Sequence, residues 1–488
     1  MASSREEGAR RLSAADDLGR RGNYVALKQA VRFYRELYAR PDFRRDGARR
    51  LTEAALLLSV REKELGISNT SYLDDALRVI AENRSLGVFT PYAEIAGAFW
   101  VQGKGVMADV DGRFAGKETE EKLKRMDAEL KQKARGDEFS AYMYATLRCF
   151  LASPEEQNEA PGELAALFPD SLLLAYKNAT CPIENEERLT TLLAREPDFF
   201  EAAYHLGLLS LSRGNLLESE GHFLKTHEGI PESTQATLLL ATIAFAMDEV
   251  ERSLEFYDKT LDIVPDYRDA LLGKAICLST LGRPEEAIAA CKKIIALGYW
   301  LLGESYYWLA WNKHELKDEA AAEADIEQAK GRLPTSTEVF TLAGLIALAK
   351  EDPVKAEKDF LEAVKYNAAN SPALFNLGSL YARKENWADS GLYFEKAAFA
   401  FENEGRTLQA KITEALYSNL APERKERFLA RRKSLLEKAL LSRATAFYNA
   451  AAGYHNAGQK YKALEMAARS AEHPAFKEKS EELAAGIK

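Results

Sequence analysis

The sequence is poor in the residues on which stapled or metal-bound folds depend. It holds only four cysteines in 488 residues, too few and too scattered for a disulfide framework or a zinc site. We expect Cys277 and Cys291 to be buried free thiols that pack as small hydrophobic residues. The six histidines are spread along the chain without the spacing of metal ligands. The sequence therefore predicts neither a metal nor a cofactor.

Long apolar runs are also missing. No stretch of 18 or more apolar residues occurs, which excludes a membrane-spanning helix. The first seven residues contain no hydrophobic segment and do not read as a signal peptide. As the sequence stands we expect a cytoplasmic protein. The alternative is a periplasmic protein or lipoprotein, if a leader has been removed and Met-Ala stands in its place.

Catalytic signatures are absent as well. The sequence has no Gly-x-Ser-x-Gly elbow and no Gly-x-Gly-x-x-Gly after a strand, and signals for β-structure are scarce. No block of mixed α/β pattern is large enough for a catalytic domain, so we expect no enzyme. The net charge of −9 argues against general attraction to nucleic acid or anionic lipid, and no nucleic-acid partner is expected.

What the sequence does contain is a repeat. Seven stretches share one pattern and begin at Phe200, Thr234, Arg268, Gly303, Thr337, Ser371 and Ala444. The first six are spaced by 34 to 35 residues, and an irregular stretch precedes the seventh. Small residues recur at the eighth position, namely Gly207, Ala241, Ala275, Ala310, Gly344, Gly378 and Ala451, and large ones at the twenty-fourth, namely Phe223, Tyr257, Phe360 and Phe394. This alternation of close crossings and space-filling residues is typical of a helical solenoid.

The units resemble the tetratricopeptide repeat (TPR) family. Two of the clearest read LFNLGSLYARKENWADSGLYFEKA (374–397) and AAYHLGLLSLSRGNLLESEGHFLKT (202–226). Pro231, Pro265 and Pro334 occupy the family's position between repeats, where proline restrains the backbone between two helices. The resemblance implies an all-α fold, a TPR-type α-solenoid whose helical hairpins stack into a right-handed superhelix.

Four parts are expected along the chain. Residues 1–199 hold divergent, degenerate helical hairpins, and residues 200–404 hold the regular array. Residues 405–443 form an irregular helical hairpin with a basic helix, and residues 444–488 form a last repeat and a capping helix. A cap is expected because the last apolar face of a solenoid would otherwise meet water.

The resemblance also predicts a partner-binding groove, because the first helix of every repeat lines the inner wall of such a superhelix. The predicted groove residues are Tyr204, Leu208, Leu238, Thr242, Leu272, Ile276, Tyr307, Trp311, His314, Leu345, Phe375, Ser379 and Arg383. Tyr307, Trp311 and His314 share one helix face, since steps of three and four residues align. Aromatic anchors in a concave site are typical binding hot spots. The alternative is that these side chains are additional core.

A second surface is predicted on the basic helix 422–443, and its residues are Arg424, Arg427, Arg431 and Arg432. It is either a solvated helix face or a docking surface for an acidic partner. The predicted function is a non-catalytic interaction scaffold or adaptor that binds a protein or peptide segment in an apolar, aromatic groove. A bacterial envelope or secretion assembly is one setting that the resemblance suggests.

Two other functions stay open. One is a regulatory or sensor protein whose divergent N-terminal half binds a small ligand or effector, and the other is an enzyme with an unrecognised site there. A pocket of convergent polar residues around 85–160 would favour these two. An open apolar groove at 200–400 would favour the scaffold.

Overall fold

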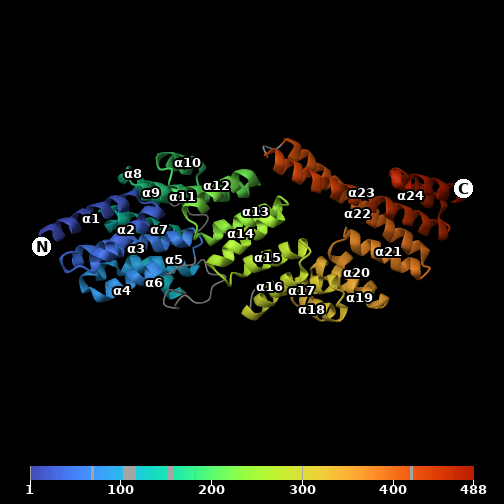
Figure 1. Ribbon diagram of the computed structural model, residues 1–488, viewed down its shortest axis with the longest axis horizontal. Helices are drawn as coiled ribbons and strands as arrows, with labels where there is room; N and C mark the ends of the chain where they lie inside the picture. The colour runs from blue at the N-terminus through green and yellow to red at the C-terminus, as the bar shows by residue number, and fades with distance from the viewer. Residues whose placement is uncertain are drawn as a thin grey trace. The chain divides into compact units, whose positions relative to one another are not determined.

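A computed structural model describes residues 2–67, 71–102, 117–151, 159–181, 183–298, 301–417 and 421–487. Every regular element in these ranges is a helix, as the repeats predict (Figure 1). The chain divides into two compact units. Unit 1 comprises Met1–Ile243 and Asp262–Pro265, and unit 2 comprises Ala244–Leu261 and Asp266–Lys488.

Unit 1 is built of helical hairpins of uneven length. Its helices are α1 (Ala2–Arg21), α2 (Tyr24–Tyr38), η1 (Pro41–Phe43), α3 (Arg44–Glu64), α4 (Ser71–Glu82), η2 (Arg84–Phe89), α5 (Thr90–Gln102), α6 (Lys117–Lys133), α7 (Glu138–Leu151), α8 (Ala160–Leu167), α9 (Leu172–Thr180), α10 (Glu186–Arg195), α11 (Phe200–Ser212), α12 (Leu216–Gly229) and most of α13 (Thr234–Ala246).

Unit 2 holds the regular part of the array and the C-terminal helices. Its helices are most of α14 (Val250–Ile263), then α15 (Arg268–Thr280), α16 (Pro284–Leu297), α17 (Leu302–Glu315), α18 (Glu319–Arg332), α19 (Thr337–Ala349), α20 (Pro353–Tyr366), α21 (Ser371–Arg383), α22 (Trp387–Tyr417), α23 (Pro422–Asn456), α24 (Lys460–Ala471), η4 (Pro474–Phe476) and α25 (Lys477–Ile487).

The two unit boundaries depart from the expected division at residue 200. The repeat that begins at Thr234 is tied to the divergent hairpins by side-chain hydrogen bonds. The Ser233 hydroxyl donates to the carbonyl of Leu65 at 2.8 Å, and the Thr234 hydroxyl donates to that of Gly66 at 2.5 Å. Unit 1 therefore includes the start of the regular array. The hydrogen bonds from Ser233 and Thr234 join this start to the divergent hairpins, across the boundary that the sequence pattern places at residue 200.

The small residues at the eighth position make the close crossings that the repeat predicts. A Cβ atom on Gly378 would lie 2.8 Å from the Phe394 ring, and one on Gly344 would lie 2.5 Å from the Phe360 ring. Phe394 and Phe360 stand at the twenty-fourth position of the same repeats and are buried. These two hairpins thus close by packing a ring directly on a glycine backbone.

The turn inside each repeat needs one residue in the left-handed region. Gly214, Gly282 and Gly458 fill this place with φ of 78°, 69° and 75°. Other repeats place non-glycine residues there at positive φ, namely Asp248, Lys317, Glu351 and Glu385. Asp pays a smaller penalty in this region than most residues because its short polar side chain bonds locally.

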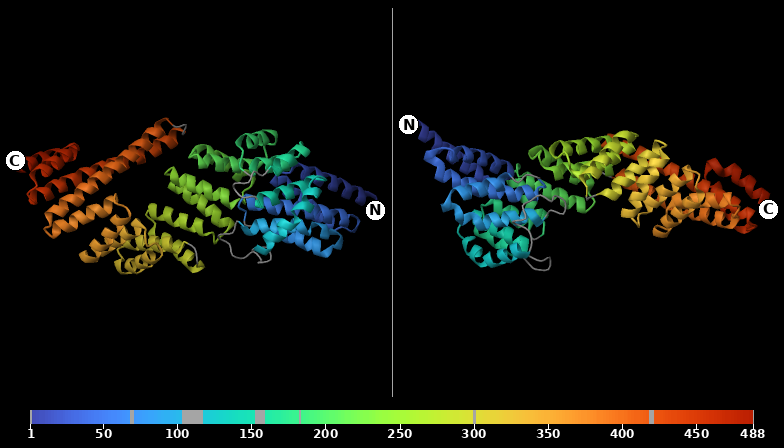
Figure 2. Two further views of the ribbon diagram at one scale, coloured as in Figure 1. Left: turned by 180° about the vertical axis from the view of Figure 1, so that it is seen from behind. Right: turned by 90° about the horizontal axis from the view of Figure 1, so that it is seen from below.

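Residues 405–443 belong to a helical hairpin whose two helices extend beyond the predicted bounds on both sides. α22 runs unbroken for 31 residues and α23 for 35 residues. The expected unit therefore consists of an extension of the helix before it and an extension of the helix after it. The two long helices pack against each other along their length, with Gly391 and Gly453 in direct backbone contact, and we call them the long hairpin (Figures 1 and 2).

Candidate partner-binding surfaces

The predicted groove residues fall in both units. Those in unit 1 are Tyr204 and Leu208 on α11 and Leu238 and Thr242 on α13. Those in unit 2 are Leu272 and Ile276 on α15, Tyr307, Trp311 and His314 on α17, Leu345 on α19, and Phe375, Ser379 and Arg383 on α21. All are half-buried or exposed except Tyr204.

Tyr204 is a core residue and not a groove residue. Its side chain is only 5% exposed. The ring lies edge-on to His205 and Phe223, with centroid distances of 5.5 and 5.7 Å. The repeat position alone could not show this, because the close packing of α11 and α12 around Phe223 decides it.

The densest group of partly exposed aromatic residues lies on α17. The Tyr307 ring stands 5.3 Å from that of Trp308 and 6.4 Å from that of Trp311, and the two indoles are 6.3 Å apart. We call these three residues the aromatic group. Tyr307 and Trp311 pack on the core formed with α18 and α19. Burial, with a smaller contribution from Glu338, raises the pKa of Tyr307 to about 12, so this hydroxyl stays protonated.

Two other predicted groove residues on α17 and α21 are engaged within the chain. The Nδ1 atom of His314 lies 2.7 Å from Oε2 of Glu319, at the start of α18. The Ser379 hydroxyl donates to the Phe375 carbonyl at 3.1 Å. The Phe375 ring packs edge-on against Phe394, 5.1 Å between centroids. Each residue keeps part of its surface accessible, but His314 and Ser379 have polar partners already.

The predicted basic surface proves to be largely paired inside unit 2. Nε and Nη2 of Arg424 donate to the Glu249 carboxylate at 2.5 and 2.9 Å. Arg432 and Arg431 approach the Asp248 carboxylate at 2.9 and 3.4 Å. Arg427, the fourth predicted residue, is exposed. A solvated helix face is therefore the wrong description for Arg424 and Arg432, which are half-buried.

The pKa of Glu249, on the acidic side of this contact, is shifted by its arginine partners. Burial raises the pKa of Glu249, but hydrogen bonds from Arg424 and Arg252 outweigh it and hold that pKa below its ordinary value. Glu249 is therefore ionised over the whole neutral range. Sequence reasoning found the arginines but missed Asp248 and Glu249, which lie more than 170 residues earlier and carry no local signal.

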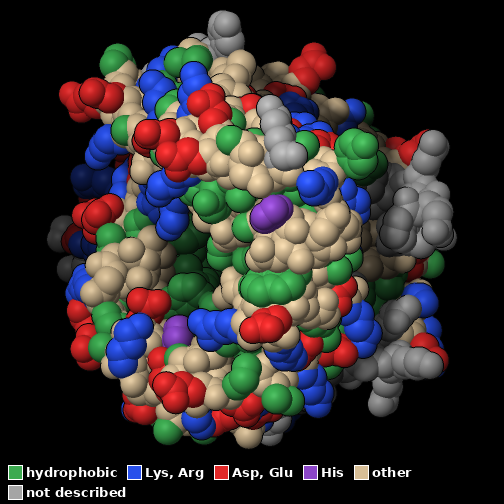
Figure 3. Space-filling view, turned by 90° about the vertical axis from the view of Figure 1, so that its right-hand side faces the viewer, with side chains coloured by type: hydrophobic (Ala, Val, Ile, Leu, Met, Phe, Trp, Pro, Cys, Tyr) green, Lys and Arg blue, Asp and Glu red, His purple; other side chains and the backbone are tan. Residues whose placement is uncertain are grey.

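On the face seen from the C-terminal end of the chain, charged side chains are mixed. Figure 3 shows Lys and Arg interleaved with Asp and Glu, with hydrophobic side chains scattered between them. Such a surface offers no strong field of one sign.

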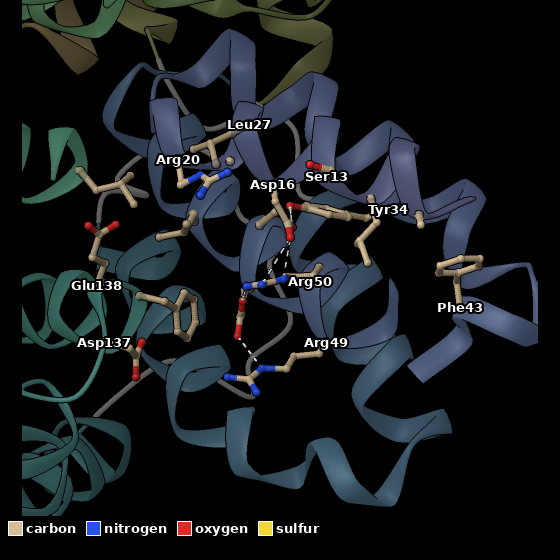
Figure 4. Close-up of a pocket in the computed structure, with 18 residues that line it drawn as sticks. Ser13, Asp16, Arg20, Leu27, Tyr34, Phe43, Arg49, Arg50, Asp137 and Glu138 are labelled. Carbon is tan, nitrogen blue, oxygen red and sulfur yellow. Dashed lines mark hydrogen bonds and ion pairs between the residues drawn. The ribbon is translucent and has the colours of Figure 1, made fainter. Parts of the chain in front are cut away.

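Unit 1 contains a cavity of about 560 Å³ between α1, α2, α3, α7 and α9 (Figure 4). Its floor is apolar and includes Leu27, Leu57, Phe139 and Leu173. Its rim carries a chain of charges, in which the Tyr34 hydroxyl donates to Asp16 at 2.8 Å. Arg50 lies between Asp16 and Glu53, and Arg49 donates to Glu53 at 3.0 Å. The cavity reaches the expected 85–160 region only through residues 137–139.

A buried charge cluster lies deeper in unit 1. Arg61 is fully buried, and its guanidinium stacks 3.5 Å from the Tyr176 ring centroid. Lys177 donates to Glu64 at 2.6 Å. Burial raises the pKa of Glu201 to about 7, against the attraction of Arg61. The sequence analysis missed this cluster, because charged residues in separate degenerate repeats show no pattern along the chain.

The structure corrects the expectation on cysteines. Cys149, in α7, and Cys181, just after α9, form a disulfide across a separation of 32 residues. The packing of α7 on α9 brings them together, with 6.1 Å between their Cα atoms. Cys277 and Cys291 are buried free thiols, as expected. Among the described residues, no group of three or more His, Cys, Asp or Glu side chains could hold a metal ion.

Comparison with known proteins places the repeats in a family. The profile of the tetratricopeptide repeat family matches residues 238–298 and 341–404. Human tetratricopeptide repeat protein 6 is 25% identical over 207 residues, which cover 35% of this chain and 40% of that protein. A protein of Methanocaldococcus jannaschii is 49% identical over 39 residues, 8% of this chain and 45% of that protein. The chain thus spans less than half the length of the curated relatives it matches.

Among solved structures, the chain is similar to a tetratricopeptide repeat protein from Parabacteroides merdae. The two share 14% identity, and the match covers 57% of this chain and all of that one, with a TM-score of 0.38. Within the described ranges, no helix combines the length and the apolar character needed to span a bilayer.

Proposed function

This chain is a tetratricopeptide repeat protein, and we propose that it acts as a non-catalytic scaffold. It binds a protein or peptide segment on the surface formed by the first helix of each repeat in unit 2. Repeats of this family serve in general as protein-interaction scaffolds. An array of this kind offers an extended surface because each repeat adds one more helix pair to it. The proposed site runs over α15, α17, α19 and α21.

The aromatic group on α17 carries the proposal. Tyr307, Trp308 and Trp311 are large side chains that stay half-buried at the surface of a closely packed helix pair. Tyr and Trp present a large rigid area at a small cost in side-chain entropy, and they dominate binding energy at many interfaces. Leu272, Ile276 and Leu345, on the neighbouring repeats, supply half-buried apolar surroundings.

The test uses the aromatic group directly. We expect Trp311→Ala and Tyr307→Ala each to weaken binding of a recovered partner by about 2 kcal/mol, with unchanged helicity. The partner is recovered by affinity capture on the full chain with identification by mass spectrometry, and affinity is then measured by calorimetry. Tyr461→Ala is the matched control, since Tyr461 is 93% exposed on α24. Normal binding by both groove variants, together with early melting, would assign these rings to the core.

An oxidising compartment is part of the proposed setting. The Cys149–Cys181 disulfide supports it, because disulfides persist in secreted, periplasmic or surface proteins and are rare in the cytosol. This favours the exported alternative over the cytoplasmic one, and agrees with a role in a bacterial envelope or secretion assembly. Mass spectrometry of protein alkylated in intact cells tests it, and a reduced Cys149 would contradict it.

The cavity in unit 1 favours a second candidate function, the binding of a small ligand. Its volume lies within the range of about 300–1,000 Å³ that ligand pockets span. A library of small molecules screened by thermal shift would identify such a ligand. Ala54→Phe fills the cavity from α3 and would abolish the shift, whereas Ala430→Phe on exposed helix α23 would not. A shift that survives Ala54→Phe would place the ligand elsewhere.

A further inference from the structure

The start of α23, from Arg424 to Leu435, contacts a much earlier part of unit 2. We call these residues, together with Leu416 on α22, the tip of the long hairpin. The hairpin leaves α21 and extends back to the turn between α13 and α14 (Figures 1 and 2). At this turn lie Asp248 and Glu249, the acidic pair bound by Arg432, Arg431 and Arg424. The contact joins residues about 175 positions apart, so the repeat pattern alone does not produce it.

This contact has the geometry of carboxylate recognition. Arg424 approaches Glu249 with two nitrogen atoms at 2.5 and 2.9 Å, a bidentate arrangement that fits a carboxylate in both distance and direction. Arg432 binds the adjacent carboxylate of Asp248 while its guanidinium lies 4.9 Å from the Phe428 ring centroid. Two arginines of the tip, Arg424 and Arg432, thus bind the carboxylates of two neighbouring acidic residues.

Apolar surface lies beside these arginines. Leu416, near the end of α22, is 51% exposed, and Leu435, one turn after Arg431 and Arg432, is 38% exposed. Leucines at this exposure are not needed to close the hairpin, whose core is formed by residues such as Ala439 and Ile412. A surface with arginines next to exposed leucines can bind a partner segment that contains both acidic and apolar residues.

We propose that the tip of the long hairpin is a binding surface for an acidic, extended polypeptide segment, and that the Asp248–Glu249 turn occupies it as an intramolecular substitute in the free protein. This inference rests on the proposed scaffold function and names the chemistry of its partner. The partner segment displaces the turn, pairs its carboxylates with Arg424 and Arg432, and continues along the surface of unit 2. The intramolecular contact thereby lowers the apparent affinity, because only the open fraction binds.

The experiment breaks the same contact from its two sides. Asp248→Asn with Glu249→Gln frees the arginines and leaves them intact. Arg424→Gln with Arg432→Gln frees the turn but removes the binding groups. A contact that only stabilises the fold predicts the same effect from both pairs. An intramolecular substitute predicts opposite effects on binding.

The probe is a displayed library of random linear 12-residue peptides, enriched on the full chain. We expect enriched peptides to contain adjacent Asp or Glu residues. By fluorescence anisotropy we expect them to bind the Asp248→Asn/Glu249→Gln protein about tenfold tighter than wild type, and the Arg424→Gln/Arg432→Gln protein about tenfold more weakly. Glu351→Gln with Asp352→Asn, at the same turn position three repeats further along the chain, is the matched control and should leave affinity unchanged.

Three results would overturn the inference: enriched peptides without acidic residues, a shift of affinity in the same direction for both variant pairs, or no enrichment at all. Circular dichroism of each variant shows whether the fold is kept. Failure of the scaffold proposal is separable, because it concerns the aromatic group. Acidic peptides that respond to both tip variants but not to Trp311→Ala would uphold the tip surface and reject the proposed groove.

Discussion

At the scale of single residues, the packing of this chain depends both on glycines that lack a side chain and on ionisable side chains that are buried. Gly378 and Gly344 have no side chain because a phenylalanine ring occupies that space. In unit 1 the opposite holds, since the ionisable side chains of Arg61, Glu62 and Lys177 are buried. At the glycines, the available space decides which residue fits. At the buried ionisable residues, the charges of the neighbouring groups decide the protonation state.

The glycine crossings yield the first prediction. We expect Gly378→Leu to destabilise unit 2 by about 1–3 kcal/mol, because the added atoms must displace the buried Phe394 ring. Chemical unfolding followed by circular dichroism measures this loss. Gly331→Leu is the control, since a Cβ at Gly331 meets nothing within 4 Å. Equal stability of the Gly378 variant and wild type would show that the helices do not cross here.

Glu62 gives a prediction on pH. Burial raises its pKa to about 9, and Lys28 and the Tyr24 hydroxyl lower it only in part. Between its ordinary pKa and about 9, the folded protein keeps a proton that the unfolded chain releases. Stability from this group is therefore present at low pH and is lost as pH rises, by up to about 1.4 kcal/mol per pH unit.

The test compares Glu62→Gln with wild type by urea unfolding at pH 5, 7 and 9. We expect the variant to gain stability relative to wild type as the pH rises, since glutamine carries no proton to lose. Glu36→Gln, at an exposed residue, should follow the wild-type curve. Parallel curves for Glu62→Gln and wild type would mean that Glu62 titrates as an exposed carboxylate.

At the scale of elements, helices of irregular length make contacts that the regular repeats do not make. The standard hairpins of unit 2 have helices of 13 or 14 residues, whereas α22 and α23 are more than twice as long. Their extra length brings Arg424 and Arg432 to the Asp248–Glu249 turn of a much earlier repeat. In unit 1, the end of the short helix α9 is joined to α7 by a covalent link.

The disulfide supplies the prediction at this scale. We expect Cys149→Ser with Cys181→Ser to destabilise unit 1 by about 2–4 kcal/mol, because the link closes a loop of 32 residues and restricts the unfolded chain. A thermal melt under reducing and non-reducing conditions measures it. Wild type should lose stability on reduction, and the double variant should not respond. Equal melting of all four samples would show that the two sulfur atoms are not joined.

At the scale of the whole molecule, a solenoid lacks one central core. Each repeat contacts mainly its neighbours, so local damage stays local. The buried clusters of unit 2 follow this rule. One groups α17, α18 and α19, a second groups α19, α20 and α21, and a third groups the start of α21 with α22 to α25.

Hydrogen exchange tests this locality. In Gly378→Leu we expect faster amide exchange in α21 and α22, the helices that meet at this crossing, and unchanged exchange in α2 and α3. The physical reason is that the lost packing energy belongs to one hairpin and is shared only with adjacent ones. Exchange that rises equally along the entire chain would show that the molecule unfolds as a single cooperative unit.

The sequence by itself determined the tetratricopeptide repeats and the all-α solenoid, because the same small and large residues recur at the same positions of each regular repeat. Tertiary structure alone decided that Tyr204 is core, that Cys149 meets Cys181, and that Arg424 and Arg432 bind Asp248 and Glu249. The cysteine and arginine contacts join helices that do not follow one another in the sequence, so a pattern that repeats from one hairpin to the next holds no record of them. The burial of Tyr204 depends on how its ring meets Phe223 and His205, which its repeat position does not specify.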